Sequence, residues 1–132
     1  MVEKIKHSEK EWNEILNKDE FKVLRKKGTE APFTGRLLEN KEKGVYVCAG
    51  CGNPLFSSDT KFDSGSGWPS FWDVISSDNV ELKNDYSFGM KRIEVICSVC
   101  GGHLGHVFDD GPKPSGKRYC INSVSLKFNN KK

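Results

Sequence analysis

ICSVCG, residues 96–101, repeats the design of VCAGCG, residues 47–52, and these two stretches decide how the chain is held together. In each, two cysteines are separated by two residues on a tight turn, and a glycine follows directly. Glycine permits the unusual backbone angle that aims both sulfurs at one point. The two turns offer enough thiolates for a closed tetrahedral zinc site, with the ligands Cys48, Cys51, Cys97 and Cys100.

The metal of this site is expected to be structural. Iron in a rubredoxin-like site fits the same cysteine spacing and stays open as an alternative. A redox-active C-x-x-C motif normally begins a helix in a βαβ setting, which this sequence lacks. Soft thiolates favour zinc, and a closed four-cysteine site has no open position for chemistry. We therefore predict one Zn²⁺ ion that contributes to folding, with the two turns brought together by the tertiary fold.

Length and composition limit the number of domains and the class of protein. At 132 residues, the chain is expected to form one domain over residues 1–132. A hydrophobic content of 36% and a charged content of 30% indicate a globular protein rather than a disordered one. The net charge of +3 comes from positive residues scattered among negative ones, which predicts a solvated surface and no nucleic-acid binding.

The expected cellular location and oligomeric state of the protein follow from signals that the sequence lacks. No apolar run reaches the length of a membrane span, and the charged N-terminal stretch has no apolar segment of a secretory signal. The odd count of five cysteines argues against a disulfide framework and for a reducing compartment. We expect a cytoplasmic monomer that binds no membrane.

Residues 8–28 predict a helical arm. Ser8 and Glu11 have the spacing of a capping box, and Gly28 is a candidate C-terminal cap. Helical spacing puts three apolar residues on one face: Trp12, Ile15 and Leu16.

The following residues, about 33–128, predict a mainly antiparallel β core. Short segments rich in β-branched and aromatic residues alternate there with glycine, aspartate, asparagine and serine. The candidate strands are residues 44–48, 54–57, 72–75, 92–97, 106–108 and 118–128.

The fifth cysteine stands alone in RYCINSVSLKF, residues 118–128. Strand alternation puts Arg118, Cys120 and Asn122 on one face, which continues through Val124, Leu126 and Phe128. A guanidinium two residues away favours the nucleophilic thiolate, and the Asn122 amide can bind a substrate or orient a side chain. The alternative is that Cys120 is only a small buried hydrophobic residue.

Two other stretches suggest partners for Cys120. The four paired cysteines already satisfy a zinc ion, which leaves His103 and His106 free for proton transfer or substrate binding. Gly105 lies between them, and a bend there would let both reach one site. Trp68 follows a glycine- and serine-rich loop and can wall an apolar pocket, although at least one aromatic residue of Trp68, Phe71 and Trp72 is expected in the core.

The combination of both C-x-x-C-G turns, FDSGSGWPSFW (62–72), GGHLGHVFDDGP (101–112) and RYCINSVSLKF resembles the MsrB-type methionine-R-sulfoxide reductases from about Trp12 to Phe128. This resemblance implies two antiparallel β-sheets behind short N-terminal helices, with the zinc far from the reacting sulfur. It also implies site residues: the nucleophile Cys120, the sulfoxide-binding His103, His106 and Asn122, and the substrate-binding Trp68, Phe108 and Arg118.

The same resemblance implies a reaction. The Cys120 thiolate would attack the sulfur of methionine-R-sulfoxide, protein-bound or free, and become a sulfenic acid while methionine leaves. Many family members carry a resolving cysteine where this chain has Ser66, so recycling is expected to need thioredoxin or another external thiol. Two other hypotheses remain at this point: a non-enzymatic zinc module for nucleic acid or protein, and a regulator whose Cys120 senses oxidants.

Overall fold

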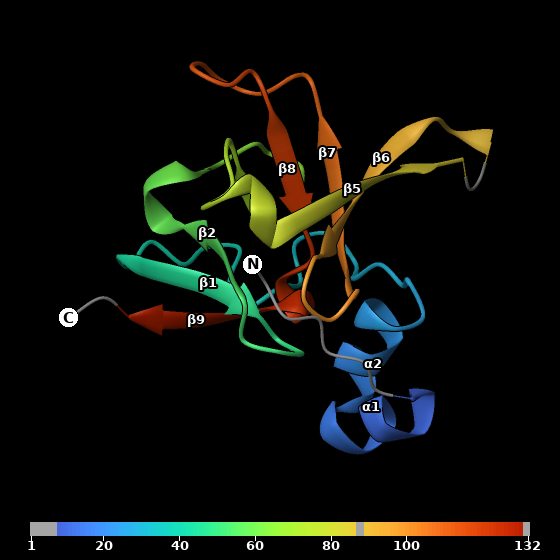
Figure 1. Ribbon diagram of the computed structural model, residues 1–132. Coiled ribbons are helices and arrows are strands. Elements are labelled where there is room, and N and C mark those ends of the chain that lie inside the picture. Colours follow the sequence, from blue (N-terminus) through green and yellow to red (C-terminus); the bar gives the residue numbers. More distant parts are fainter. Residues whose placement is uncertain (1–7, 87–88, 131–132) are drawn as a thin grey trace.

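Two short helices form the N-terminal arm, as expected, in the computed structural model, which describes residues 8–86 and 89–130 (Figure 1). Helix α1 spans Glu9–Ile15 and α2 spans Lys18–Leu24. Ser8 and Glu11 form the predicted capping box. Asn17 and Glu20 form a second one, and this new helix start is why the chain does not continue as a single helix.

The packing of the arm departs from prediction at two residues. Trp12 and Leu16 are buried, but Ile15 is 55% exposed because α1 ends there and the chain turns at Leu16. The Gly28 N–H donates to the Lys22 carbonyl, yet the left-handed conformation belongs to Lys27, with φ of 58°. Neither described helix has the length and apolar character needed to cross a membrane.

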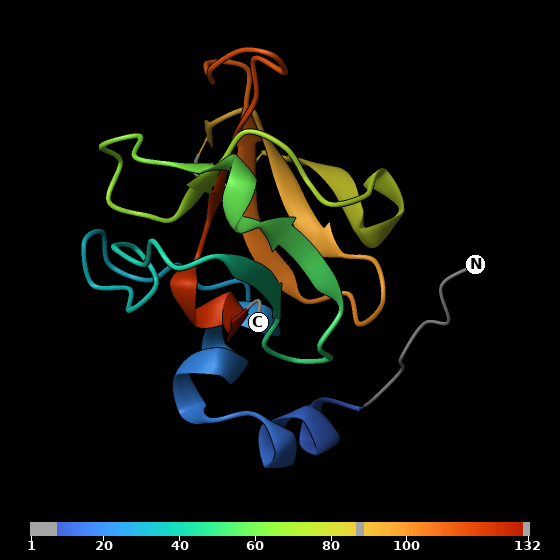
Figure 2. The same cartoon turned by 90° about the vertical axis from the view of Figure 1, so that its left-hand side faces the viewer.

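Two antiparallel sheets confirm the predicted fold class (Figures 1 and 2). The smaller sheet has the order β2-β1-β9, with β1 at Gly44–Cys48, β2 at Pro54–Ser57 and β9 at Leu126–Asn130. The larger sheet has the order β3-β4-β8-β7-β6-β5. Its strands are β3 Lys61–Phe62, β4 Ser70–Phe71, β5 Val80–Asp85, β6 Arg92–Cys97, β7 His103–Phe108 and β8 Arg118–Ile121. Short 3₁₀ turns lie at Ser58–Thr60, Ser77–Asn79 and Ser123–Ser125.

The strand predictions at 44–48, 54–57 and 92–97 are confirmed, and 106–108 is the end of the longer β7. The predicted strand at 72–75 is wrong, since the chain leaves the sheet after Phe71. The Trp72 and Ile75 N–H groups donate to the carbonyls of Thr60 and Leu55, outside any strand pair. Strand β5 was not predicted, because it is an edge strand whose middle residues are exposed on both faces and show no alternation.

The predicted strand 118–128 is two strands in two different sheets. Strand β8 ends at Ile121, the 3₁₀ turn Ser123–Ser125 follows, and β9 begins in the other sheet. The turn redirects the chain, so the predicted common face stops at Cys120. Val124, Leu126 and Phe128 belong to the turn and to β9 instead.

The core lies between the two sheets. Phe56 of β2 stacks on Phe71 of β4 at 4.3 Å between ring centroids, and Tyr46 of β1 meets the edge of the same ring at 5.1 Å. Phe71 is fully buried, which confirms that an aromatic residue of the tryptophan loop belongs to the core. This contact joins the two sheets, so the opposite face of the larger sheet is the one that can carry a functional site.

Candidate active site

The four paired cysteines meet at one point, as predicted. Their sulfurs all lie within 4.8 Å of one another, with Cys48–Cys100 at 3.7 Å and Cys51–Cys97 at 3.5 Å. A tetrahedral zinc ion with bonds of about 2.3 Å separates its sulfurs by about 3.8 Å, so the cluster fits a metal ion of this kind. Gly52 and Gly101 have φ values of 81° and 75°, the left-handed conformation for which glycine was expected after each pair.

The helical arm is anchored on these metal-binding turns. The Arg25 guanidinium donates to the Cys100 carbonyl at 2.7 Å and lies over the Trp12 ring at 4.8 Å. A β-carbon on Gly50 would meet the same ring at 3.5 Å. The arm therefore takes its position from the metal site.

Strand register places Cys120 in a row of polar side chains across the larger sheet. Cys120 on β8 is directly opposite His106 on β7 and Ser70 on β4, and His106 is opposite Glu94 on β6. Directly opposed residues of antiparallel strands point to the same face, with β-carbons about 5 Å apart. Phe108 and Arg118 form the next pair on this face. The register thus brings together candidates from two separate motifs, GGHLGHVFDDGP and RYCINSVSLKF.

Burial dominates the chemistry of the Cys120 thiol. Burial raises its pKa above the ordinary value, while the Ser66 hydroxyl and the charge of Arg118 lower it by less. Ser66 Oγ lies 3.8 Å from Cys120 Sγ. Arg118 favours the thiolate, as expected, but desolvation of the charged form outweighs this effect.

Arg118 has a second partner that weakens its effect on the thiol. Its guanidinium donates twice to the Asp110 carboxylate, at 2.8 and 3.1 Å, and stacks on the Phe108 ring at 4.4 Å. An open groove of about 590 Å³ lies beside this pair, with Ser66 also on its wall. Arg118 therefore links the Cys120 strand to a surface that an external molecule can reach.

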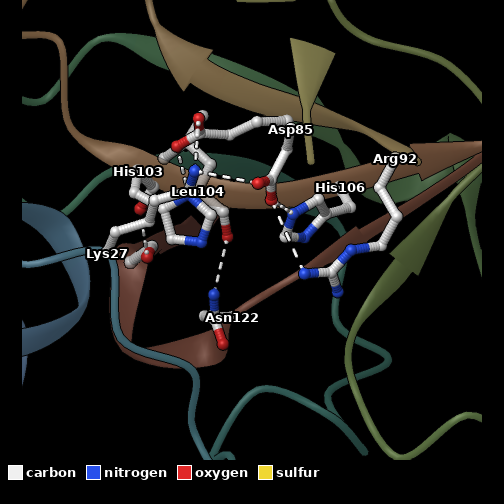
Figure 3. Close-up of polar contacts among 9 residues, drawn as sticks. Lys27, Asp85, Arg92, His103, Leu104, His106 and Asn122 are labelled. Carbon is white, nitrogen blue, oxygen red and sulfur yellow. Dashed lines mark hydrogen bonds and ion pairs between the residues drawn. The ribbon is translucent and has the colours of Figure 1, made fainter. Parts of the chain in front are cut away.

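A β-bulge brings His103 and His106 together. The register of β6 and β7 shifts between Val95 and Ile96, so that one extra residue separates the histidines and both reach the same face. Their ring centroids are 5.5 Å apart (Figure 3). A β-carbon on Gly105 would lie 2.1 Å from the Cys120 carbonyl oxygen. Gly105 is thus needed for close strand approach, and the bulge provides the bend expected of it.

Each histidine is held by a buried carboxylate that sequence reasoning missed. His103 Nδ1 donates to Glu94 at 2.6 Å, and His106 Nε2 donates to Asp85 at 2.7 Å. Burial lowers the pKa of His103, although Glu94 opposes this. The motif RIEVIC contains Glu94 on the alternate face from its core residues, but nothing in the sequence pairs it with a histidine.

Asn122 and Trp68 converge on a residue that was also missed, Glu30. The Asn122 side chain accepts from the Glu30 N–H at 3.0 Å and donates to the Leu104 carbonyl at 3.0 Å. The Trp68 indole N–H donates to the Glu30 carbonyl at 3.0 Å. Because Asn122 is only 3% exposed and bonded to backbone on both sides, it positions neighbouring segments. The Glu30 carboxylate accepts from the Val124 N–H, and burial raises its pKa.

Comparison with known proteins finds one family over most of this chain. The SelR domain family matches residues 16–130. The peptide methionine sulfoxide reductase MsrB of Methanosarcina barkeri is 68% identical, over 94% of this chain and 87% of its own. That of Leptospira interrogans is 56% identical, over 94% and 95%. The mitochondrial methionine-R-sulfoxide reductase B3 of Mus musculus is 55% identical over 95% of this chain, which spans 49% of the mouse protein.

Proposed function

This chain belongs to the SelR family and is a methionine-R-sulfoxide reductase, and from this premise we propose that Cys120 is its nucleophile. The observation that supports this most is the row in which Cys120 lies directly opposite His106, with Arg118 on the same face. A reactive thiol needs a proton acceptor and a neighbouring positive charge, and this row supplies both. The non-enzymatic zinc module and the oxidant sensor have no comparable support.

The proposed reaction transfers oxidation from the sulfoxide sulfur to the thiol sulfur. The Cys120 thiolate attacks the sulfoxide sulfur and forms a sulfur–sulfur bond, while the sulfoxide oxygen takes up two protons and leaves as water. A water molecule then attacks the Cys120 sulfur and gives up one proton, and the sulfur–sulfur bond breaks so that methionine leaves. The products are methionine and Cys120 sulfenic acid, so the thiol sulfur loses the two electrons that the sulfoxide sulfur gains. One thiol is sufficient for this half of the reaction.

The two histidines are proposed to handle the proton. Each imidazole already has one nitrogen bonded to a carboxylate, so its other nitrogen is the one available to exchange a proton. His106 lies directly opposite Cys120 and is suited to accept the thiol proton, whose removal burial makes difficult. His103, beside it, is suited to bind and protonate the sulfoxide oxygen.

Aromatic side chains are proposed to select the R epimer. Trp68 and Phe108 offer apolar surface for the substrate methyl group, and the histidines offer the polar side for the oxygen. The two epimers exchange the places of methyl, oxygen and lone pair, so only one fits both surfaces. Protein-bound methionine sulfoxide is the proposed physiological substrate, and free methionine sulfoxide the smaller alternative.

Zinc is proposed for the four-cysteine cluster, where sulfur separations fit a tetrahedral ion. Cys48, Cys51, Cys97 and Cys100 would hold it, and the ion would supply structural cross-linking of the two turns. All reaction steps belong to side chains of the larger sheet.

Recycling is proposed to depend on an external thiol such as thioredoxin. Ser66 lies 3.8 Å from the Cys120 sulfur but cannot form a disulfide. An external thiolate would attack the sulfenic acid, release water and form a mixed disulfide that a second thiol then reduces. A cytoplasmic location, a monomeric state and the single-domain boundary 1–132 stay predictions.

The test is a single turnover without reductant, followed by product analysis. The wild type should release about one methionine per enzyme from the R epimer and none from the S epimer, and dimedone should label Cys120. Cys120→Ser should release none while it keeps its metal content and melting temperature. Turnover by Cys120→Ser, or equal rates on both epimers, would contradict the assignment.

A further inference from the structure

Lys27 has an unusual backbone conformation and an unusual position. It follows α2 in the left-handed region, with φ of 58°, although glycine comes directly after it in the sequence. Left-handed conformations are unfavourable for side chains such as lysine and persist where surrounding contacts compensate. The contacts here are two buried carboxylates: Lys27 Nζ lies 3.2 Å from Asp85 Oδ1 and 3.4 Å from Glu94 Oε1.

Each of these carboxylates divides its two oxygens between Lys27 and a histidine. Asp85 turns Oδ1 to Lys27 and Oδ2 to His106, while Glu94 turns Oε1 to Lys27 and Oε2 to His103. Figure 3 shows Lys27 and the two histidines near Asp85. An ammonium that holds one oxygen of each carboxylate limits rotation of both, and hence of both imidazole rings.

Charge balance in the cluster also depends on Lys27. Asp85 and Glu94 are 3% and 5% exposed, and two cations face them: Lys27 from the arm and Arg92 from β6, whose guanidinium lies 3.5 Å from Asp85. Cys120 on β8 is a further titratable neighbour, opposite His106. With Lys27 in place, two negative charges meet two positive ones. Without it, the remaining negative charge would favour the protonated form of His103.

We propose that Lys27 is a positioning residue for sulfoxide reduction: by bridging Asp85 and Glu94 it orients both imidazole rings beside Cys120. This role rests on the proposed function of the histidines. It gives the helical arm a part in the reaction, because the arm that carries Lys27 is anchored on the metal-binding turns by Arg25. The positive charge of Lys27 is also among the causes that lower the pKa of His103.

The test compares Lys27→Met, Lys27→Arg and the control Lys26→Met. Methionine keeps length without charge, arginine keeps the charge, and Lys26 is an exposed neighbour that pairs with Glu9 outside the cluster. Rates of R-epimer reduction are measured from pH 5 to 9, and NMR follows the imidazole signals of each variant over the same range. Melting temperature and metal content show that each variant is folded.

Lys27→Met should lower kcat about tenfold with a smaller change in KM, as loss of an outer partner of a functional histidine does. Its His103 signal should titrate at higher pH than in the wild type. Lys27→Arg should restore most of the kcat and most of the wild-type titration of His103. Lys26→Met should match the wild type in both measurements. Unchanged imidazole signals in folded Lys27→Met, or shifted signals with an unchanged rate, would overturn the proposal. An inactive wild type would instead overturn the proposed function, while the NMR titration would still report on the cluster.

Discussion

At the scale of single residues, the balance of burial and charge at Cys120 makes a prediction about its reactivity. Burial raises the pKa of this thiol, and Ser66 and Arg118 lower it by less. Arg118→Met should raise the pKa further, which leaves less thiolate at any fixed pH and slows alkylation by iodoacetamide. Below the pKa, the rate should rise about tenfold per pH unit in both proteins, with the variant curve displaced to higher pH.

Mass spectrometry of the Cys120 peptide measures this rate separately from the four clustered cysteines. Lys117→Met is the matched control. Lys117 directly precedes Arg118 in the sequence, but it pairs with the exposed Asp109. If the curves of Arg118→Met and the wild type coincide, the Arg118 charge has no effect on the thiol.

The histidines and Asn122 should separate into two classes when each is replaced by alanine. His103→Ala and His106→Ala should reduce the rate by about a hundredfold or more with a small change in stability, because proton transfer is lost. Asn122→Ala should also lower the free energy of unfolding by about 1–3 kcal/mol, because the Glu30 N–H loses its acceptor in a buried place. Thermal melts and single-turnover rates measure the two effects. Two histidine variants with wild-type rates would place the acid elsewhere.

At the scale of elements, strand β7 depends on Gly105 for its distance from β8. A β-carbon there would lie 2.1 Å from the Cys120 carbonyl oxygen, so Gly105→Ala must push the two strands apart. We expect a loss of about 1–3 kcal/mol of stability and a larger proportional loss of rate, because His106 moves away from Cys120. Denaturant unfolding and single turnover measure these. A fully active Gly105→Ala would show that the direct opposition of His106 and Cys120 is not required.

The loop before β4 holds position 66 close enough to Cys120 for a cysteine there to act as a resolving thiol. Ser66 Oγ already lies 3.8 Å from Cys120 Sγ, and a small movement of the loop would allow a bond of about 2.0 Å between sulfurs at these positions. Ser66→Cys should therefore form an internal disulfide after one turnover and resist over-oxidation to sulfinic acid. Peptide mapping after oxidation measures both. Persistent sulfenic acid in Ser66→Cys would show that the loop geometry prevents bonding.

At the scale of the whole molecule, the four-cysteine cluster joins a connecting turn of each sheet, and the helical arm bonds to one of these turns. Removal of one ligand, as in Cys51→Ser, should lower metal content and melting temperature together, because binding energy is folding energy in such sites. The arm should also become sensitive to limited proteolysis near α2, since Arg25 loses the ordered turn that it bonds. An active, fully stable protein without metal by elemental analysis would contradict this.

The sequence by itself determined the features that depend on near neighbours. Turn chemistry within six residues identified the four cysteines that cluster and the glycines after them, and capping residues located the start of the arm. Strand alternation gave Arg118 and Cys120 a common face, which the register confirms. These succeed because a turn, a cap or a pleat is decided by a few adjacent side chains.

Only the tertiary structure decided the features that depend on distant partners. Asn122 bonds to Glu30, 92 residues away, and Lys27 reaches carboxylates on β5 and β6 that no local pattern links to it. A bulge in register, invisible in hydrophobic spacing, brought the two histidines together. The pKa of Cys120 followed burial rather than the adjacent guanidinium. Each of these features depends on which side chains are shielded from water and which polar groups they then meet. Both conditions arise only when the two sheets and the arm have packed around the site.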